Sequence, residues 1–392
     1  MFLRTGRALC QGALAILFAA PLPGYTQGRL PDELKPAVER VERLITDELS
    51  KDNLGSVTVG VISGVDLIWA KSFGLSDIEK RTPAMIGSVY RIGSITKQFT
   101  ALMLLQMVEA GKVHLADPVE KYLPEINGVK GRMPWAPPVT IYQLATMTSG
   151  LAKEPEELSQ YASGPVSDWQ RTLISALPDT HYVYEPGTRY LYSNVGYAIL
   201  GAALSRAAGE TYVDYVKQHI FIPLQMSDTA FEPKEEIKAR ISTGYEVGGD
   251  GKIDTATPAR EHNGRGYKVP NGAAYSTVSD LARFVEFELG QGPEGVLKKM
   301  TLLENLSRTG SSSFDFRMGY GVGFMATRHG DFIYYGHEGS VAGYSASAIF
   351  DRISRTGVVV LRNVNGGKFS VPALSVRILE ELARAKTGHR AP

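Results

Sequence analysis

Ser94 and Lys97 lie three positions apart, and their residue types could do chemistry together. This spacing places both side chains on one face of a helix, and an apolar run to Val108 follows them. At the start of a helix, free backbone N–H groups and the positive end of the dipole favour an oxyanion and disfavour an ammonium group. A lysine that loses its proton there can activate the serine as a nucleophile. A capping serine followed by a solvated lysine is the alternative, and this motif alone does not decide between them.

The segments around this pair predict the elements that must hold it. Apolar residues at helical spacing predict a helix over 31–50, and two strands joined through Ser63-Gly64 follow it. Helical segments broken by Pro and Gly fill the middle of the chain, and strand-like segments return at 331–363 before a last helix. These elements predict an α+β fold, in which one antiparallel sheet flanked by helices is completed by both ends of the chain. The middle would form a mainly helical second lobe at roughly 100–265.

Length and composition limit the classes of protein. The 392 residues are 43% hydrophobic, enough for one large domain with two lobes or for two domains. The formal net charge is +1 and no long basic block stands out, which argues against a nucleic-acid partner. The sequence has no His-Glu-x-x-His motif and no Cys cluster, so we expect neither a metal nor a cofactor. It also lacks the Gly-x-Ser-x-Gly motif of α/β-hydrolases.

The N-terminal segment predicts export. Arg4 and Arg7 precede an apolar stretch and a Pro/Gly-rich break, which is typical of a secretory signal. We expect a signal peptide over 1–27, the functional domain over 28–392, and a periplasmic or secreted protein; an uncleaved N-terminal anchor is the alternative. Cys10 is the only cysteine and lies in this segment, so the mature chain would contain no thiol.

An ordered series of segments resembles a known family. In chain order they are "YRIGSITKQFTALMLLQMVEAGK", "VTIYQLATMTSGL", "YEPGTRYLYSNVGYAILGAALSRAAG", "NGAAYSTVSDLARF" and "GYGVGF". Together they resemble the serine β-lactamase and penicillin-binding superfamily, nearest to its class C β-lactamase branch, which includes DD-peptidases, D-aminopeptidases and esterases. The resemblance covers most of the chain. It implies a β-lactamase/transpeptidase-like fold and a serine hydrolase that forms an acyl-serine intermediate.

The same resemblance implies roles for individual residues. Ser94 would be the acylated nucleophile and Lys97 its proton partner. Tyr192, in "YSN", would be the second acid/base group, provided that a neighbour such as Lys97 eases the ionisation of its phenol. Asn194 would orient the lysine and bind the acyl amide of the substrate.

The third family element is usually Lys-Thr-Gly on a strand beside the cleft. That triplet occurs at 386–388, but it ends a helical run near the C-terminus, so we interpret it as a helix end. His337 and Gly339, in "YYGHEGS", fit the strand better. His337 would be a donor toward the substrate, Gly339 would let a ligand approach the strand, and the backbone N–H groups of Ser340 and Ser94 would form an oxyanion hole. A satisfied strand histidine is the alternative for His337.

Two departures from the family pattern bear on the substrate. Glu338 stands where a hydroxyl usually helps to hold a substrate carboxylate, and Met147 replaces a histidine whose role we expect to be structural. We therefore predict an exported serine hydrolase acting on a small-molecule or peptide ester or amide. A class C-type β-lactamase, a DD-peptidase or D-aminopeptidase, and a non-catalytic penicillin-binding or sensor protein are the alternatives. The oligomeric state is not predicted.

Overall fold

The computed structural model describes residues 28–306, 308–312, 317–330 and 332–388. The predicted signal segment, 1–27, lies outside these ranges together with Cys10, so export stays a prediction. Within the described ranges, no helix is long and apolar enough to cross a membrane.

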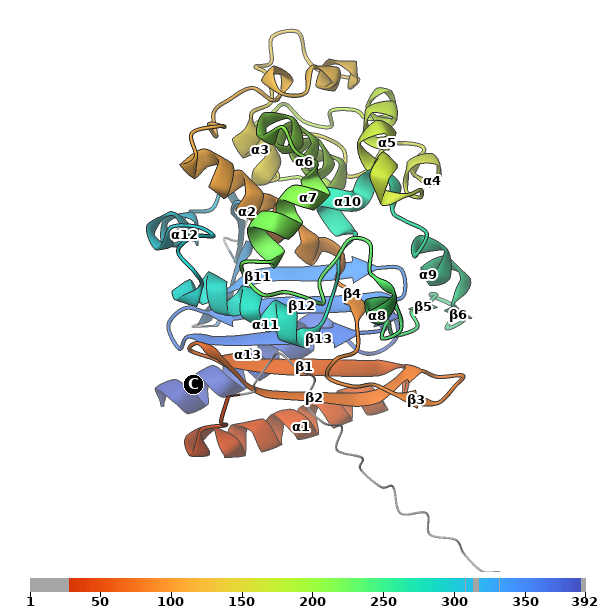
Figure 1. The fold of residues 1–392 in the computed structure, drawn as a ribbon, viewed down its shortest axis with the longest axis vertical. Helices are drawn as coiled ribbons and strands as arrows, with labels where there is room; N and C mark the ends of the chain where they lie inside the picture. Colours follow the sequence, from red (N-terminus) through yellow and green to blue (C-terminus); the bar gives the residue numbers. More distant parts are fainter. Residues whose placement is uncertain (1–27, 307, 313–316, 331, 389–392) are drawn as a thin grey trace, which may run out of the picture.

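A nine-stranded antiparallel sheet is the centre of the described structure (Figure 1). In the order in which they lie side by side, its strands are β3 (Thr82–Pro83), β2 (Asp66–Asp77), β1 (Ser56–Ser63), β13 (Thr356–Arg362), β12 (Tyr344–Asp351), β11 (Phe332–Val341), β10 (Met325–His329), β9 (Met318–Tyr320) and β8 (Ser311–Ser312). β1 pairs with β13 from Val57↔Arg362 to Ser63↔Thr356, so strands from the two ends of the chain meet inside one sheet. The predicted fold class is confirmed.

Apolar residues at successive positions explain why the central strands are buried on both faces. In β13, Val358 and Val360 point to one apolar cluster, whereas Val359 and Leu361 point to another. The predicted hairpin between β1 and β2 is present, and Gly64 turns the chain with a φ of +67°. Two smaller sheets complete the strands: β14 (Val364–Asn365) with β5 (Tyr245–Val247) and β6 (Ile253–Asp254), and β4 (Tyr90–Arg91) with β7 (Tyr275–Ser276).

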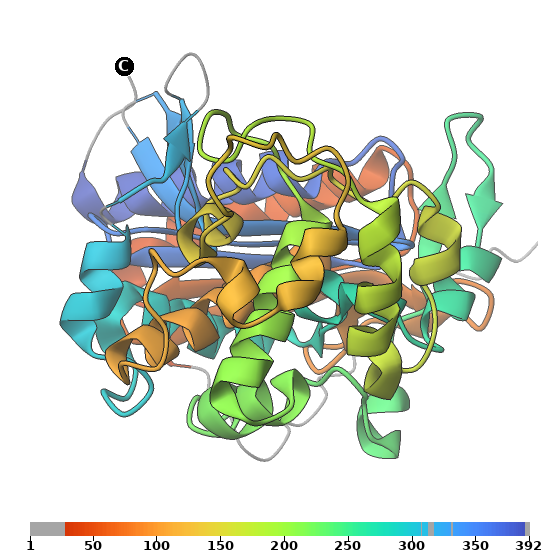
Figure 2. The ribbon, with the colours of Figure 1, turned by 90° about the horizontal axis from the view of Figure 1, so that it is seen from above.

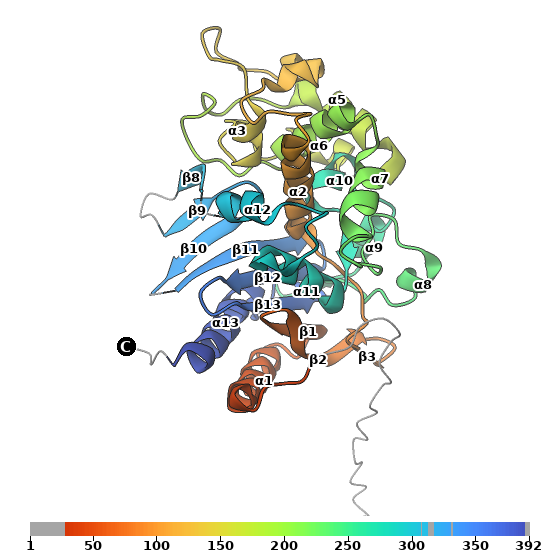
Figure 3. The same cartoon turned by 60° about the vertical axis from the view of Figure 1, so that its left-hand side comes forward.

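Two terminal helices cover one face of the sheet. They are α1 (Lys35–Ser50) and α13 (Val371–Thr387), which pack on each other and on the strands, while α11 (Val278–Glu286) packs on the opposite face (Figure 3). α13 ends at Gly388, whose φ of +70° is typical of a helix C-cap, and Lys386 lies in its last turn. The interpretation of the Lys-Thr-Gly triplet as a helix end is therefore confirmed.

A helical lobe lies on the same side of the sheet as α11. Its central helix is α2 (Thr96–Glu109), which is buried nearly all round and is followed by Gly111 with a φ of +67°. α6 (Asn194–Ala208) lies beside it above the sheet (Figure 2). The other helices with α geometry are α3 (Ile141–Ala145), α4 (Leu158–Tyr161), α5 (Trp169–Ala176), α7 (Tyr212–Val216), α8 (Glu235–Lys238), α9 (Ala256–Glu261), α10 (Val269–Gly272) and α12 (Lys299–Leu306).

Candidate active site

Ser94 lies in a tight turn that leads directly into the buried helix of the helical lobe. The turn, η2 (Gly93–Ile95), is a 3₁₀ segment that continues into α2. Gly93 has a φ of +51°, and a Cβ atom there would lie 2.9 Å from the backbone nitrogen of Ser340. Only glycine combines this conformation with this close approach. The predicted place of Ser94 at the start of a buried helix is confirmed.

Lys97 is completely buried, and its amine touches three oxygen atoms. Lys97 Nζ lies 3.0 Å from Ser94 Oγ, 2.7 Å from Asn194 Oδ1 and 2.8 Å from the backbone oxygen of Asn271. The amide and backbone oxygens can only accept, whereas the serine hydroxyl can donate or accept. The structure thus brings the predicted Ser94, Lys97 and Asn194 together.

The surroundings of Lys97 favour its neutral form. Burial lowers the pKa of Lys97 well below its ordinary value, and the charges of Lys268, Arg265 and Lys153 lower it further. The negative charge of Glu154 raises the same pKa in opposition. All three direct contacts of Nζ are uncharged oxygens, which stabilise an ammonium group less than a carboxylate would. The amine therefore loses its proton more readily than the amine of an exposed lysine, and once neutral it can accept a proton.

Tyr192 lies against the same amine. Lys97 Nζ is 4.9 Å from the centroid of the Tyr192 ring, which places the amine over the aromatic face. Burial raises the pKa of Tyr192, while a hydrogen bond with Ser94 lowers it. The phenol is therefore protonated at rest and lies next to both the serine and the lysine. Its predicted acid/base role stays a prediction, and the structure places its ring beside Lys97.

Met147 supports the loop that carries this tyrosine. Met147 has a φ of +59°, its backbone oxygen accepts from Leu191 N at 2.8 Å, and its sulfur accepts from Ser193 N at 3.2 Å. Ser193 caps α6 by accepting from Gly196 N at 2.9 Å. These contacts hold the segments on both sides of Tyr192, in agreement with the structural role expected for Met147.

His337 lies on β11, and both of its ring nitrogens have partners. Nδ1 is 2.5 Å from the backbone oxygen of Glu338, which can only accept, so Nδ1 carries the proton. Nε2 then accepts from the hydroxyl of Tyr320 at 3.0 Å. Burial, with the nearby Lys97 charge, lowers the pKa of His337 to about 3. The ring is therefore neutral and satisfied, as in the alternative interpretation, and donation to a substrate would require it to release one partner.

Gly339 and Ser340 bring β11 against the Ser94 turn. A Cβ atom on Gly339 would lie 2.0 Å from the backbone oxygen of Ile92, so the protein's own backbone occupies the space that we predicted for a ligand. The hydroxyl of Ser340 donates to Asn365 Oδ1 at 3.1 Å, and its backbone nitrogen lies beside Gly93. The oxyanion hole formed by the backbone N–H groups of Ser94 and Ser340 stays a prediction, which this proximity favours.

Glu338 occupies the other side of the strand. Neighbouring side chains of a strand point to opposite faces, and Glu338 influences the pKa of Tyr334, which packs against the α1 and α13 cluster. His337 faces Tyr192 and Tyr320 instead. Burial raises the pKa of Glu338.

Four residues that the sequence analysis did not single out complete the site. Glu154 accepts from Asn194 Nδ2 at 2.7 Å and from Lys268 Nζ at 3.1 Å, and Tyr267 donates to its other oxygen. Asn271 donates its Nδ2 to the backbone oxygen of Asn194 at 2.9 Å. Glu154 follows the "TSGL" segment by three residues, but no local pattern connects it with positions more than a hundred residues later.

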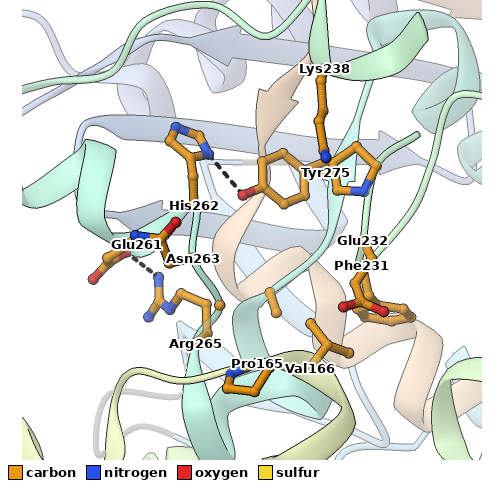
Figure 4. A pocket seen from close by; sticks show the side chains of 13 residues that line it. Pro165, Val166, Phe231, Glu232, Lys238, Glu261, His262, Asn263, Arg265 and Tyr275 are labelled. Carbon is orange, nitrogen blue, oxygen red and sulfur yellow. Dashed lines mark hydrogen bonds and ion pairs between the residues drawn. The ribbon is translucent and has the colours of Figure 1, made fainter. Parts of the chain in front are cut away.

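The described structure also contains a cavity of about 190 Å³ (Figure 4). Arg265 lines it and donates to Glu261 at 2.8 Å, and His262 lies 2.8 Å from the hydroxyl of Tyr275. Ser94 and Lys97 are not among its lining residues, which are Pro165, Val166, Phe231, Glu232, Pro233, Lys238, Glu261, His262, Asn263, Gly264, Arg265, Ala273 and Tyr275. Within the described chain, no group of three or more His, Cys, Asp or Glu side chains could hold a metal ion.

Comparisons with known proteins agree with this architecture. A family model described as Beta-lactamase matches residues 41–383. Beta-lactamase-like protein 2 of Dictyostelium discoideum is 29% identical over 279 residues, which are 70% of this chain but only 49% of that relative. This chain therefore spans about half the length of that relative.

Two solved structures share the fold. The octameric penicillin-binding protein homologue from Pyrococcus abyssi matches with a TM-score of 0.74 and 26% identity, over 89% of this chain and 79% of that chain. A class C beta-lactamase matches with a TM-score of 0.74 over 93% of this chain and 100% of that chain. The second match has 19% identity, so it bears on the fold alone.

Proposed function

This chain belongs to the Beta-lactamase family, and we propose that it is a serine hydrolase in which Ser94 is acylated by an ester or amide substrate. The contacts of Lys97 carry the proposal. A neutral amine has two N–H groups and one lone pair, and the Asn194 side chain and the Asn271 backbone oxygen each require one N–H. The lone pair is then left for Ser94 Oγ, the third neighbour, so the neutral lysine is arranged to accept the serine proton.

The proposed reaction has two halves. Ser94 Oγ passes its proton to Lys97 and attacks the substrate carbonyl, which gives a tetrahedral oxyanion. The carbon–leaving-group bond then breaks, and the leaving group takes a proton from Tyr192, which recovers one from Lys97. In the second half a water molecule gives up a proton to Tyr192 and Lys97 and attacks the acyl carbon. The bond between the acyl carbon and Ser94 Oγ then breaks, and Ser94 takes the proton back. The acid product leaves, and the site returns to its starting state.

The proposed substrates lack a free carboxylate near the acyl carbonyl. His337 stands where the resembled family usually has a lysine, and its ring is neutral because burial lowers its pKa to about 3. Glu338, the next residue of the strand, points to the opposite face and supplies no cation either. A site without a fixed positive charge at this point holds a carboxylate poorly, which favours neutral acyl esters over penicillins and peptides ending in a carboxylate.

Intact-protein mass spectrometry over time tests the proposal. The full chain and Ser94→Ala are each mixed with a neutral p-nitrophenyl ester and with benzylpenicillin, while product release and drug loss are followed. We expect ester turnover by the wild type, a transient acyl adduct, and no adduct or turnover above background for Ser94→Ala, which should keep its unfolding temperature. Turnover by Ser94→Ala equal to that of the wild type would contradict the acyl-serine mechanism.

The measurement with benzylpenicillin distinguishes the alternative functions. Drug loss without an accumulated adduct would support a β-lactamase, and a lasting adduct on the wild type alone would support a penicillin-binding peptidase or sensor. Either result would overturn the proposed preference for neutral esters and would leave Ser94 as the nucleophile.

A further inference from the structure

A second group of residues surrounds the amide of Asn194. Glu154 accepts from Asn194 Nδ2 at 2.7 Å, and Lys268 forms an ion pair with the same Glu154 oxygen at 3.1 Å. Tyr267 donates to the other oxygen of Glu154. The side chain of Lys268 is 9% exposed and that of Glu154 is 20% exposed, so the pair is shielded from solvent screening.

This group determines which way the Asn194 amide points. A carboxylate can only accept hydrogen bonds, so the amide nitrogen must face Glu154. The amide oxygen must then face Lys97, where it accepts from Nζ at 2.7 Å. In the reverse orientation the amide N–H₂ would meet the amine and compete for its lone pair. Glu154 thus controls the arrangement on which the proton transfer from Ser94 depends.

We propose that Glu154 and Lys268 are positioning residues for Lys97, with Glu154 holding the Asn194 amide in one orientation and the two opposite charges setting the proton affinity of the amine. The inference rests on the proposed function in one respect, which is that Lys97 is the base. It adds two residues that do not touch the reacting atoms.

The charges around Lys97 give the two residues opposite effects. Glu154 raises the pKa of Lys97, whereas Lys268 lowers it. Burial lowers the pKa of Lys268, and Glu154 opposes that change. The titratable and charged groups that face Lys97 come from every element around it: Ser94 in η2, Lys153 and Glu154 in the loop after α3, Tyr192 before α6 and Tyr197 in it, Arg265 and Lys268 at η8 (Gly266–Lys268), and His337 in β11.

Charge-reducing variants test the electrostatic part. Glu154→Gln keeps an oxygen for Asn194 and Lys268 but removes the negative charge, so the titration midpoint of Lys97 should fall by about 0.5–1 pH unit. Lys268→Met removes the positive charge, so the midpoint should rise by about as much, and the double variant should return close to the wild type. The midpoint is read directly by NMR of the lysine side-chain carbon and nitrogen next to the amine in the full chain, with Lys97→Met identifying the signal.

The same shifts should appear in the pH dependence of kcat/KM. The neutral amine is the active form, so a lower pKa moves the acid limb to lower pH and a higher pKa moves it to higher pH. A structural role alone would reduce activity without moving the limb in opposite directions. If both variants shifted the acid limb equally in the same direction, or if neither shifted it, the electrostatic part of the proposal would be overturned.

The orientation part needs a different pair of variants. Glu154→Gln still offers an acceptor to the Asn194 amide and should lose about tenfold or less in kcat/KM at its optimum pH, whereas Glu154→Ala frees the amide and should lose about 10²-fold or more. Equal losses would contradict the orienting role.

Glu48 gives a matched control for these substitutions. It is a buried glutamate with two cationic partners, Lys51 at 2.6 Å and Arg377 at 2.8 Å, and it lies in α1 beyond the sheet. Glu48→Gln should leave the Lys97 midpoint unchanged. If Ser94→Ala retained turnover, the proposed function would fail, yet the NMR titration of Lys97 would still decide the electrostatic part. If one single variant failed to fold, the other and the double variant would decide it.

Discussion

Two buried basic side chains, one on each side of the sheet, are held in different ways. Lys97 and Arg362 both have fully buried side chains. Arg362 Nη2 reaches both carboxylate oxygens of Asp52, at 2.8 and 2.9 Å, and its guanidinium lies 4.2 Å from the ring centroid of Phe369. Lys97 has no such carboxylate and is held by a hydroxyl, an amide oxygen and a backbone oxygen.

Arg362 carries a permanent charge that stabilises the fold, whereas Lys97 can change its charge. A guanidinium keeps its proton in proteins, and a carboxylate beside it repays part of the cost of burial. A primary amine with only neutral acceptors can escape that cost by losing its proton. The side of the sheet with α1 and α13 therefore holds a fixed ion pair, whereas the side with α2 holds the amine that transfers a proton in the proposed function.

Replacing the Lys97 amine should have the largest effect on turnover. Lys97→Met keeps a linear apolar side chain but removes the proton acceptor, so ester turnover should fall on the order of 10⁴-fold. The free energy of unfolding should change by only about 1–2 kcal/mol, because the loss of hydrogen bonds is offset by the removal of a buried amine. Steady-state turnover and urea unfolding measure the two effects. Turnover within tenfold of the wild type would show that Lys97 is not the base.

The reverse result is expected on the other face. Asp52→Asn leaves the Arg362 guanidinium buried without its countercharge and should lower the free energy of unfolding by about 3 kcal/mol. Turnover per folded molecule should be unchanged, because Asp52 and Ser94 lie on opposite sides of the sheet. Urea unfolding with active-site titration by the ester checks both statements.

Removing both partners tests whether the unpaired charge of Arg362 causes the loss of stability. In the Asp52→Asn/Arg362→Met variant no charge is left unpaired, so the double variant should be more stable than Asp52→Asn alone. A double variant that is less stable than the single one would mean that the packing of Arg362 on Phe369, and not its charge, dominates.

The elements of the fold could be predicted because their signals are local. The helical repeat before Ser56, the Ser63-Gly64 turn and the apolar run after Ser94 each depend on a few neighbouring residues, and each became the expected element. Strands at both ends of the chain predicted that the two ends complete one sheet, and β1 pairs with β13 in that sheet. The position of Gly93 against β11 could not be predicted, because it depends on how two distant backbones approach.

The site was predicted in part for the same reason. Ser94, Lys97, Tyr192 and Asn194 lie in segments with a family pattern, and the structure brings them together. The contacts that the surrounding residues make were not predicted. Nothing in the sequence around His337 shows that Tyr320 and a backbone oxygen satisfy its ring, and nothing around Glu154 shows that it meets Lys268. Partners of buried polar groups are set by tertiary packing, which a one-dimensional pattern does not contain.

The smallest expected effect comes from the same lysine-to-methionine change at the literal Lys-Thr-Gly triplet. Lys386 is exposed at the end of α13, and its amine donates to Ser63 Oγ at 2.9 Å. Lys386→Met should change the free energy of unfolding by less than about 0.5 kcal/mol and leave turnover unchanged, because an exposed contact in the last turn of a helix contributes little. Lys97→Met and Lys386→Met apply the same chemical change to a buried amine and to an exposed one. The ratio of the turnover of the two variants therefore measures how much the effect depends on the position of the lysine. A large loss of activity in Lys386→Met would show that the triplet takes part in the reaction, and the assignment of that position on β11 to His337 would then be wrong.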